Sequence, residues 1–344
     1  MNLNREEMRM RDRRAHAVLF GFDFQVNAAI ILMLENIKEL KSLRLEGEKE
    51  DIELTLENGE KILAQAKSVE RASSDFSNVR KNLRKALTTL SEGTKKRNVK
   101  QLIFITNSPN PFNDDNSRSI FWAPTHRRFS TLPLSAQKII EDCLGKIKNP
   151  LDLQKFTIQV FPFETDDETE RYKAVMQAVN DFVGSLNANT SAGLGRKLHQ
   201  IWCNEIFTNG SKKDIDIQLS KKDIVWPIIV LETSVDRCAE NFIGQFDAGL
   251  YDEVVHLYRK TIESRCERFD FFMRVLCDYN QFQSNKKHSE KCEEFANCTW
   301  ERYKSEFSVP GIDDETQEAL TKIILYNIVY RRIIIDRIKR GVNL

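Results

Sequence analysis

The chain has 344 residues, of which 41% are hydrophobic and 30% are charged, and its formal net charge at pH 7 is +1. This length is enough for two domains that each bury a core. Because the net charge is so small, any basic surface must come from local clustering. We see no apolar run near the roughly 20 residues that cross a bilayer. The charged N-terminal residues do not resemble a secretion signal, so we expect a cytoplasmic protein.

The first half of the chain predicts an α/β unit. Apolar residues after Gly21 recur at helical spacing and predict a helix over residues 22–40. The Asn58-Gly59 pair is a hairpin turn signal between two short alternating segments. The elements expected in chain order are strands at 43–46, 51–57 and 61–69, a helix at 75–93, a buried strand at 101–108, a polar excursion at 109–135 and a strand at 156–163. This order predicts a small mixed sheet flanked by helices.

The second half predicts an all-α domain. Amphipathic helices are expected at 167–187, 193–207, 235–246, 250–284, 286–307 and 313–340, with a helix interrupted by Pro227 at 220–232. The ANTSAGLG segment at 188–195 is rich in small and polar residues, which favours a joint. We therefore predict an α/β domain at 1–190 and a helical domain at 191–344 that serves oligomerisation or partner binding.

The predicted hairpin gathers three polar side chains. Residues i and i+2 of a strand point to the same side, so Gln65 and Lys67 share one face and Ala66 faces the other. Across the Asn58-Gly59 turn, Asp51 is expected near Lys67. The pattern allows two interpretations, which are the solvated face of an ordinary hairpin or the floor of an active site.

The second interpretation has a definite chemistry, the hydrolysis of a phosphodiester. Mg²⁺ or Mn²⁺ prefers oxygen ligands, which Asp51, the Gln65 side chain and the Ala66 carbonyl would supply. Lys67 would stabilise the charge that builds on the phosphate oxygens or position the attacking water. Glu46, at the end of the preceding strand, is a candidate second carboxylate.

Four motifs in order resemble the PD-(D/E)xK nucleases. They are GFDFQ at 21–25, LEGEKEDI at 45–52, AQAK at 64–67 and FITN at 104–107. More narrowly, residues 10–190 are similar to the double-stranded DNA endonuclease domain of bacterial antiphage effectors. That domain is fused to nucleotide sensors in CBASS systems, and it is the nuclease subunit beside an SMC-like ATPase in Lamassu-type systems.

The resemblance implies a restriction-endonuclease-like fold and specific residue roles. The family's metal-binding Asp corresponds to Asp51 and its catalytic Lys to Lys67, while Gln65 stands where an acid is expected. Gln25 matches a Gln of the first helix that lies near the site, where it would contact DNA or support the fold.

The resemblance also implies partners. The helical second half lacks the texture of a nucleotide sensor, which favours control by an SMC-like ATPase and an accessory defence subunit, with a homo-oligomer as the active form. The alternatives are control by a cyclic-nucleotide sensor and a DNA-binding or adaptor subunit whose site has decayed.

A basic segment follows the hairpin. Residues 79–100 hold eight Lys and Arg against one acid, and the pairs Arg80/Arg84 and Lys81/Lys85 repeat at helical spacing. These four side chains would neutralise DNA phosphates, or they form an ordinary solvated helix face.

Two further groups are less specific. Residues 125–128, Thr-His-Arg-Arg, predict a phosphate contact or a polar loop. The four Trp residues are far apart in the sequence, so we interpret them as core or anchor residues and not as a base-stacking platform.

Overall fold

The computed structural model describes two compact units of the chain. The described residues are 3–48, 50–72, 74–93, 98–122, 124–164, 166–186, 193–232, 238–247, 249–267, 269–307, 309 and 311–344. One unit consists of Met1–Val225 with Asn343–Leu344, and the other of Trp226–Val342. The sequence placed a domain boundary near residue 190. The joint predicted there is the segment 188–195, and its residues 188–192 lie outside the described residues.

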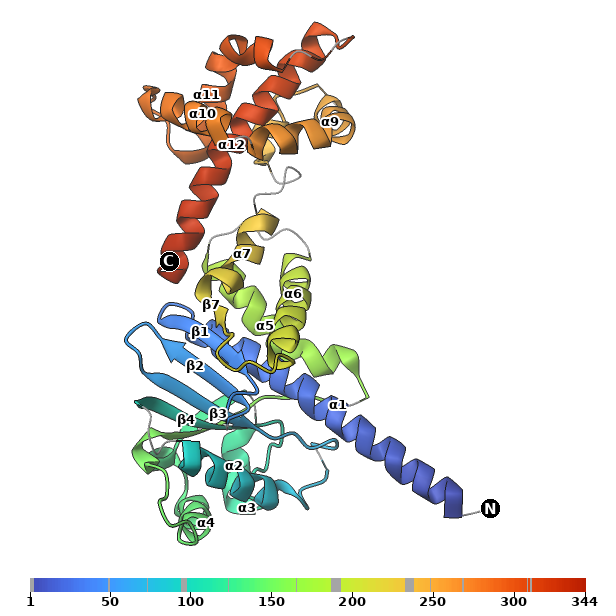
Figure 1. Ribbon diagram of the computed structural model, residues 1–344, viewed down its shortest axis with the longest axis vertical. Helices are drawn as coiled ribbons and strands as arrows, with labels where there is room; N and C mark the ends of the chain where they lie inside the picture. Colours follow the sequence, from blue (N-terminus) through green and yellow to red (C-terminus); the bar gives the residue numbers. More distant parts are fainter. Residues whose placement is uncertain are drawn as a thin grey trace. The chain divides into compact units, whose positions relative to one another are not determined.

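A seven-stranded mixed sheet forms the centre of the first unit (Figure 1). The strands are β1 (Leu40–Leu45), β2 (Ile52–Leu56), β3 (Lys61–Ala66), β4 (Val99–Thr106), β5 (Thr125–Arg128), β6 (Phe156–Val160) and β7 (Leu219–Ser220), in the order β5-β6-β4-β3-β2-β1-β7. Strands β3, β4 and β6 are parallel, and the outer pairs are antiparallel. The carboxyl ends of β3, β4 and β6 therefore meet at one edge of the sheet.

The β2–β3 hairpin forms as predicted. Ile52 pairs with Ala64 and Thr55 with Lys61, which leaves Asn58-Gly59 in the turn. Gly59 has a φ of 81°, a left-handed conformation that glycine adopts without steric cost. Extending this register by one residue places Asp51 opposite Gln65, at the carboxyl end of β3.

Helices cover both faces of the sheet (Figure 1). One side carries α1 (Leu3–Glu35), α5 (Glu168–Ser185) and α6 (Leu194–Gly210), which pack on one another. The other side carries α2 (Val79–Gly93), α3 (Asp115–Arg118) and α4 (Leu134–Leu144). Helix α6 also contacts β1, so the contacts group it with the sheet.

Helix α1 begins earlier than the predicted residue 22 and is an apolar core helix. Its segment Ala15–Glu35 is long and apolar enough to cross a membrane, although the sequence analysis found no such run. In the fold, 61% of the most apolar window is buried. Phe24, Ala28 and Ile30 are fully buried, because the helix packs against the sheet as well as against α5 and α6.

The region expected to be a polar excursion is partly core. It contains α3, the 3-10 helices η2 (Ser119–Phe121) and η3 (Phe129–Thr131), and strand β5. Phe112 and Phe121 are buried in the cluster that joins β3, β4 and β6 to α2 and α4. These apolar anchors hold an otherwise polar segment on the sheet. A further 3-10 helix, η4 (Leu153–Lys155), leads into β6.

In its described residues, the second unit consists of helices joined by turns and loops, with no strand. Helix α7 (Lys221–Glu232) crosses the boundary and contains Pro227, as the sequence indicated. The unit continues with α8 (Glu240–Ile243), α9 (Leu250–Glu267), α10 (Phe269–Gln281), α11 (His288–Tyr303), η6 (Lys304–Glu306) and α12 (Asp314–Val342). Helix α12 is its axis, because it contacts α9, α10 and α11. The ring of Tyr326 stacks on Phe242 at 3.8 Å and on Tyr330 at 5.1 Å.

Candidate active site

Asp51 and Lys67 meet where β2 begins and β3 ends. The Lys67 Nζ lies 2.7 Å from the Asp51 Oδ2, and the same oxygen accepts the Ala66 N–H at 2.9 Å. The Lys67 N–H continues the ladder to β4 by donating to the Ile105 carbonyl at 2.9 Å. The Asp51 and Lys67 side chains are 13% and 26% exposed, so the pair remains within reach of a ligand.

A tight turn holds Glu46 beside this pair. The Glu46 N–H donates to the Asp51 carbonyl at 2.8 Å, and the Gly47 N–H donates to the Glu50 carbonyl at 3.0 Å. Glu46 has a φ of 51°, in the left-handed region that a residue with a Cβ seldom occupies. Backbone strain of this kind is concentrated at functional sites.

The electrostatic surroundings of Glu46 tie it to the same site. Desolvation, followed by the nearby Asp51 carboxylate, raises the pKa of Glu46 above its ordinary value. Lys67 and a hydrogen bond from Gln25 of α1 partly offset the increase. Glu46, Asp51, Lys67 and Gln25 therefore interact as one group, although they come from three separate segments.

Gln65 is placed differently from the expectation. Its side chain is 2% exposed, and its Nε2 donates to Glu50 Oε2 at 3.1 Å instead of turning toward Asp51. Glu50 is also 2% exposed and lies against the end of α2, where a Cβ on Gly93 would lie 1.6 Å from Glu50 Oε1. The sequence analysis missed Glu50, although the Glu50-Asp51 doublet places an acid on each side of the strand.

The carboxylates of this site suit a metal ion that is bound jointly by the protein and by the phosphates of a substrate. Among the described residues, no group of three or more His, Cys, Asp and Glu side chains is placed to hold a metal ion. Mg²⁺ is usually held by one or two protein carboxylates together with substrate phosphates and water. Asp51 and the nearby Glu46 match this smaller requirement.

The basic face of α2 is largely as predicted, with one difference. Lys81, Arg84 and Lys85 are exposed, while Val79 and Leu83 are buried beneath the helix. The Arg80 guanidinium donates to the carbonyls of Phe112 and Asn113 at 2.6 and 3.1 Å. Arg80 therefore fastens the following loop to α2, while the other three cations point to solvent.

Two other expectations change. Residues Thr125–Arg128 form strand β5 and not a loop, and His126 Nε2 lies 3.0 Å from Glu35 Oε1. Trp202 is buried as expected, but Trp122 is 84% exposed and Trp226 is 63% exposed.

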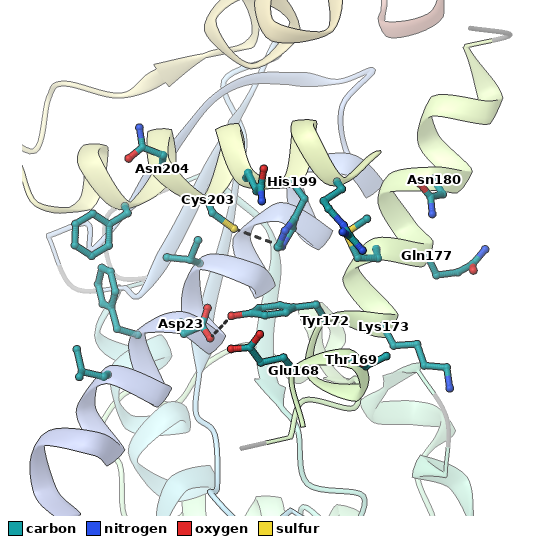
Figure 2. A pocket seen from close by; sticks show the side chains of 17 residues that line it. Asp23, Glu168, Thr169, Tyr172, Lys173, Gln177, Asn180, His199, Cys203 and Asn204 are labelled. Atoms are coloured by element: carbon teal, nitrogen blue, oxygen red, sulfur yellow. Dashed lines mark hydrogen bonds between the residues drawn. The ribbon is translucent and has the colours of Figure 1, made fainter. Parts of the chain in front are cut away.

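Apart from the Asp51 site, a cavity lies between α1, α5 and α6, and we call it the helix groove (Figure 2). Its volume is about 1110 Å³. Apolar side chains line one part of it, among them Leu19, Phe22 and Phe207. The polar lining residues include Asp23, Glu168, Lys173, Asn180, Arg196 and His199.

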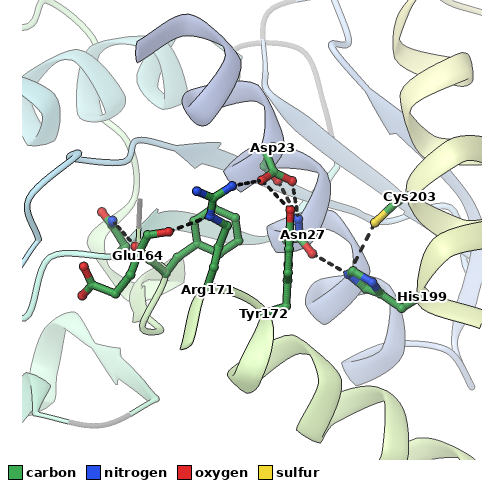
Figure 3. Close-up of polar contacts among 9 residues, drawn as sticks. Asp23, Asn27, Glu164, Arg171, Tyr172, His199 and Cys203 are labelled. Carbon is green, nitrogen blue, oxygen red and sulfur yellow. Dashed lines mark hydrogen bonds and ion pairs between the residues drawn. The ribbon is translucent and has the colours of Figure 1, made fainter. Parts of the chain in front are cut away.

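The wall of the helix groove contains a chain of hydrogen bonds (Figure 3). Asp23 accepts from Tyr172 Oη at 2.9 Å and from Asn27 Nδ2 at 2.9 Å. The Asn27 Oδ1 lies 2.8 Å from His199 Nε2, which is 3.4 Å from the Cys203 sulfur. Because the Asn27 amide nitrogen donates to Asp23, its oxygen must accept, so His199 Nε2 carries a proton.

The protonation states of this network make Cys203 unreactive. Burial lowers the pKa of His199, and it raises the pKa of Cys203 to about 12 and that of Tyr172 to about 12. Burial also raises the pKa of Asp23. A nucleophilic Cys needs a thiolate or a neighbouring base, and here the His nitrogen that faces the sulfur is a donor. The network therefore connects three helices and is not a Cys–His catalytic pair.

Comparison with known proteins gives a limited result. Neither a family model nor a curated protein matches the sequence. Among solved structures, the Cap4 SAVED/CARF-domain containing receptor of Acinetobacter baumannii with the cyclic trinucleotide 3'3'3'-cAAA is 14% identical, with a TM-score of 0.40 over 63% of this chain and 46% of that one. The Moraxella osloensis receptor of the same description is 16% identical, with a TM-score of 0.38 over 63% and 48%. The chain thus spans about half the length of these proteins, and the TM-scores are too low to establish a shared fold.

Proposed function

We propose that this protein is a metal-dependent endonuclease that cleaves double-stranded DNA with little sequence specificity. The observation that carries this proposal is the contact of the Asp51 carboxylate with both the Lys67 ammonium and the Ala66 N–H. It brings an acid and a lysine together at the carboxyl end of a parallel strand, where ligands of open α/β sheets commonly bind. Glu46 adds a second carboxylate and Gln25 an amide beside it.

Each residue of the group has a role in phosphodiester hydrolysis. Asp51 and Glu46 would hold Mg²⁺ or Mn²⁺, which when bound polarises the phosphate and lowers the pKa of a water molecule. The Ala66 carbonyl remains a candidate oxygen donor next to this pair, whereas the Gln65 side chain would have to leave Glu50 to become one. Lys67 is held at a fixed position by its ion pair, so its ammonium can stabilise the charge that develops on the phosphate oxygens.

The exposed face of α2 would contribute affinity without sequence preference. Lys81, Arg84 and Lys85 lie on the helix that follows the Lys67 strand, with their side chains toward solvent. Contacts of Lys and Arg with phosphates release counterions, so this part of the binding weakens as the salt concentration rises.

The biological setting is inferred from the four sequence motifs. They favour an effector of bacterial antiphage defence that is inactive as a monomer and becomes active on assembly into a dimer or higher oligomer. A nonspecific nuclease without such control would destroy the DNA of its host. The helical unit, with its long α12, would bind the controlling partner, and a complex with an SMC-like ATPase and an accessory subunit is the arrangement we favour.

Plasmid cleavage by the full-length protein in its oligomeric form, isolated by size-exclusion chromatography, tests the enzymatic proposal. We expect nicking and linearisation with Mg²⁺ or Mn²⁺, none with EDTA, and none for Asp51→Asn under any of these conditions. Asp75→Asn is the matched control, because Asp75 is exposed and only closes a turn with Ser77. An Asp51→Asn protein that cleaves as fast as the wild type would reject the proposal, as would cleavage that persists in EDTA.

The helix groove favours a second candidate for control, which is a cyclic oligonucleotide as the activating ligand. Its volume of about 1110 Å³ slightly exceeds the usual range for small-molecule pockets. Arg196 lies in the first turn of α6, where the helix dipole also attracts anions, and Lys173 of α5 also lines the groove. Phe207 and Tyr172 offer aromatic surfaces to bases.

This candidate is tested by adding a cyclic trinucleotide to the full-length protein and following its melting temperature. We expect an increase in melting temperature for the wild type and a much smaller increase for Arg196→Ala. Lys197→Ala is the control and should show the wild-type increase, because Lys197 is next to Arg196 in the sequence but does not line the groove. A wild-type melting temperature that does not respond to the ligand would rule this candidate out and leave the nuclease proposal untouched.

A further inference from the structure

The Trp122 side chain is exposed to solvent directly after a residue that is anchored in the core. Its side chain is 84% exposed, whereas the preceding residue, Phe121, is 1% exposed and contacts the Phe112 ring at 5.8 Å. Phe121 belongs to the core beneath β4 and β6, so the 3-10 helix η2 ends on an anchored residue. The indole follows directly after this anchor, which limits how far the chain can move to bury it.

The indole borders a small pocket whose walls suit a flat, neutral group. The pocket has a volume of about 210 Å³ and is lined by Ala72, Asn107, Pro109, Phe121, Trp122, Val160, Pro162 and Glu164. No Lys or Arg stands among these lining residues, and Glu164 contributes a carboxylate. A phosphate would be repelled there, while a base would find apolar walls and an acceptor for an amino group.

The pocket lies at the same sheet edge as Lys67. Asn107 follows β4, and its side chain bonds to the N–H and carbonyl of Val69, two residues after Lys67, at 2.9 and 2.8 Å. The same side chain donates to the Phe163 carbonyl beyond β6 at 2.8 Å. Because β3, β4 and β6 are neighbouring strands at about 4.8 Å spacing, the β6 end that carries the pocket residue Val160 is about 10 Å from the β3 end that leads to Lys67. That is about three nucleotides along a DNA strand.

We propose that Trp122 stacks on a base that has left the DNA duplex, at the mouth of this pocket, while Lys67 faces the backbone of the same strand. The inference rests on the proposed function and deepens it by assigning the substrate an unstacked base near the cut. Aromatic side chains stack on all four bases, so the contact is compatible with low sequence specificity.

Fluorescence of the full-length Lys67→Ala protein tests this, because binding is then measured without cleavage. The probe is a DNA duplex with 2-aminopurine opposite a mismatch, beside the same duplex fully paired. We expect Trp122→Ala to weaken binding of the mismatched duplex about 5- to 150-fold, the loss typical of one base–aromatic stack. Trp122→Phe, which keeps an aromatic ring, should retain most of the affinity and the 2-aminopurine quenching.

Trp226→Ala is the matched control, since Trp226 is 63% exposed but lies in the helical unit. It should bind both duplexes like its Lys67→Ala parent. Equal affinity of Trp122→Ala and its parent for the mismatched duplex would overturn the inference. So would a fall in oligomer mass of Trp122→Ala by sedimentation, which would make the indole a contact between copies. Cleavage by the protein with Lys67 intact is scored separately, so the proposed function and the stacking contact can fail independently.

Discussion

Two aspartates of the sheet-containing unit lie at the centre of polar networks. The two networks differ in whether their last side chain is accessible to solvent or buried. Asp51 joins the ends of two strands through Ala66 and Lys67, and the Lys67 side chain is 26% exposed. Asp23 joins helices through Tyr172 and Asn27, and its chain of bonds continues to buried His199.

The difference separates a structural network from a candidate catalytic one. In the Asp23 network, the Asn27 amide nitrogen donates to Asp23 and its oxygen accepts from His199. Burial raises the pKa of Asp23 and lowers the pKa of His199, and both shifts favour the neutral form of the side chain. Such a network stabilises helix packing. The Asp51 network keeps an exposed ammonium that can interact with a phosphate. Substitutions should therefore separate the two, with activity lost in one network and stability lost in the other.

The largest effect is expected from Lys67→Ala, which should lower the rate of plasmid cleavage about 10³-fold. A charge-stabilising donor of an active site typically contributes 10²–10³, and Lys67 also positions Asp51. Stability should change little, because the pair is partly exposed. The measurements are initial cleavage rates with Mg²⁺ and urea unfolding.

Lys61→Ala is the matched control for this variant. Lys61 lies at the other end of the same strand and pairs with Glu53 at 2.5 Å. Its removal should leave the rate within about twofold of the wild type. Equal losses in the two variants would mean that the Asp51–Lys67 pair is an ordinary ion pair.

The next largest effect concerns Gln65→Glu, which introduces the acid that the PD-(D/E)xK motif has at the position Gln65 resembles. We expect a loss of about 3 kcal/mol in the free energy of unfolding at pH 7, because the new carboxylate meets buried Glu50 in place of a donor. The pair would share a proton, so its pKa in the folded state is raised and stability should recover as the pH falls. Urea unfolding at several pH values measures this.

The double variant Glu50→Gln, Gln65→Glu sharpens the result by exchanging the two groups. It keeps one amide and one carboxylate in the same buried contact, so most of the stability should return. If the double variant unfolds as easily as Gln65→Glu, the hydrogen bond between positions 50 and 65 does not explain why position 65 carries Gln instead of an acid.

In the Asp23 network, Asn27→Ala should destabilise the fold by about 2 kcal/mol and leave cleavage unchanged. The side chain is fully buried, and its loss removes one hydrogen-bond partner from Asp23, which keeps Tyr172, and one from buried His199. Asn36→Ala, in the turn directly after the same helix, removes a bond to the Leu32 carbonyl in a less buried place and should cost about 1 kcal/mol. A similar cost for both would show that the network adds nothing beyond single hydrogen bonds.

The sequence predicted features of the fold that depend on local pattern. The β2–β3 hairpin follows from strict alternation and from Asn58-Gly59, and α2 from its apolar stripe. Strand β5 was not foreseen, because Thr125–Arg128 has no apolar residue and pairs with β6 only through tertiary placement. The start of α1 was placed too late, since its first residues are charged and give no apolar periodicity.

The same distinction holds for the candidate site. Asp51 and Lys67 were expected together because they face each other across one hairpin. Glu50 was missed, because its burial depends on Gly93 at the far end of α2. The bond between Asn27 and His199 joins residues 172 positions apart, a separation that periodicity in one sequence does not encode.

The smallest expected effect is a pH dependence that originates at His199. Burial lowers the pKa of His199 in the folded state below the ordinary value of a histidine side chain. As the pH falls below about 6.5, the unfolded chain therefore binds a proton that the folded chain does not, and the free energy of unfolding decreases. Above that pH the two states bind equally and this contribution is constant. Urea unfolding of the wild type and of His199→Gln at about pH 7.5 and about pH 5.5 measures this, since that range roughly spans the titration of a histidine. Between these two pH values the wild type should lose more stability than His199→Gln. An equal loss in both proteins would mean that His199 remains free to protonate in the folded chain, and the Asp23 network would then be as open to solvent as the Asp51 site.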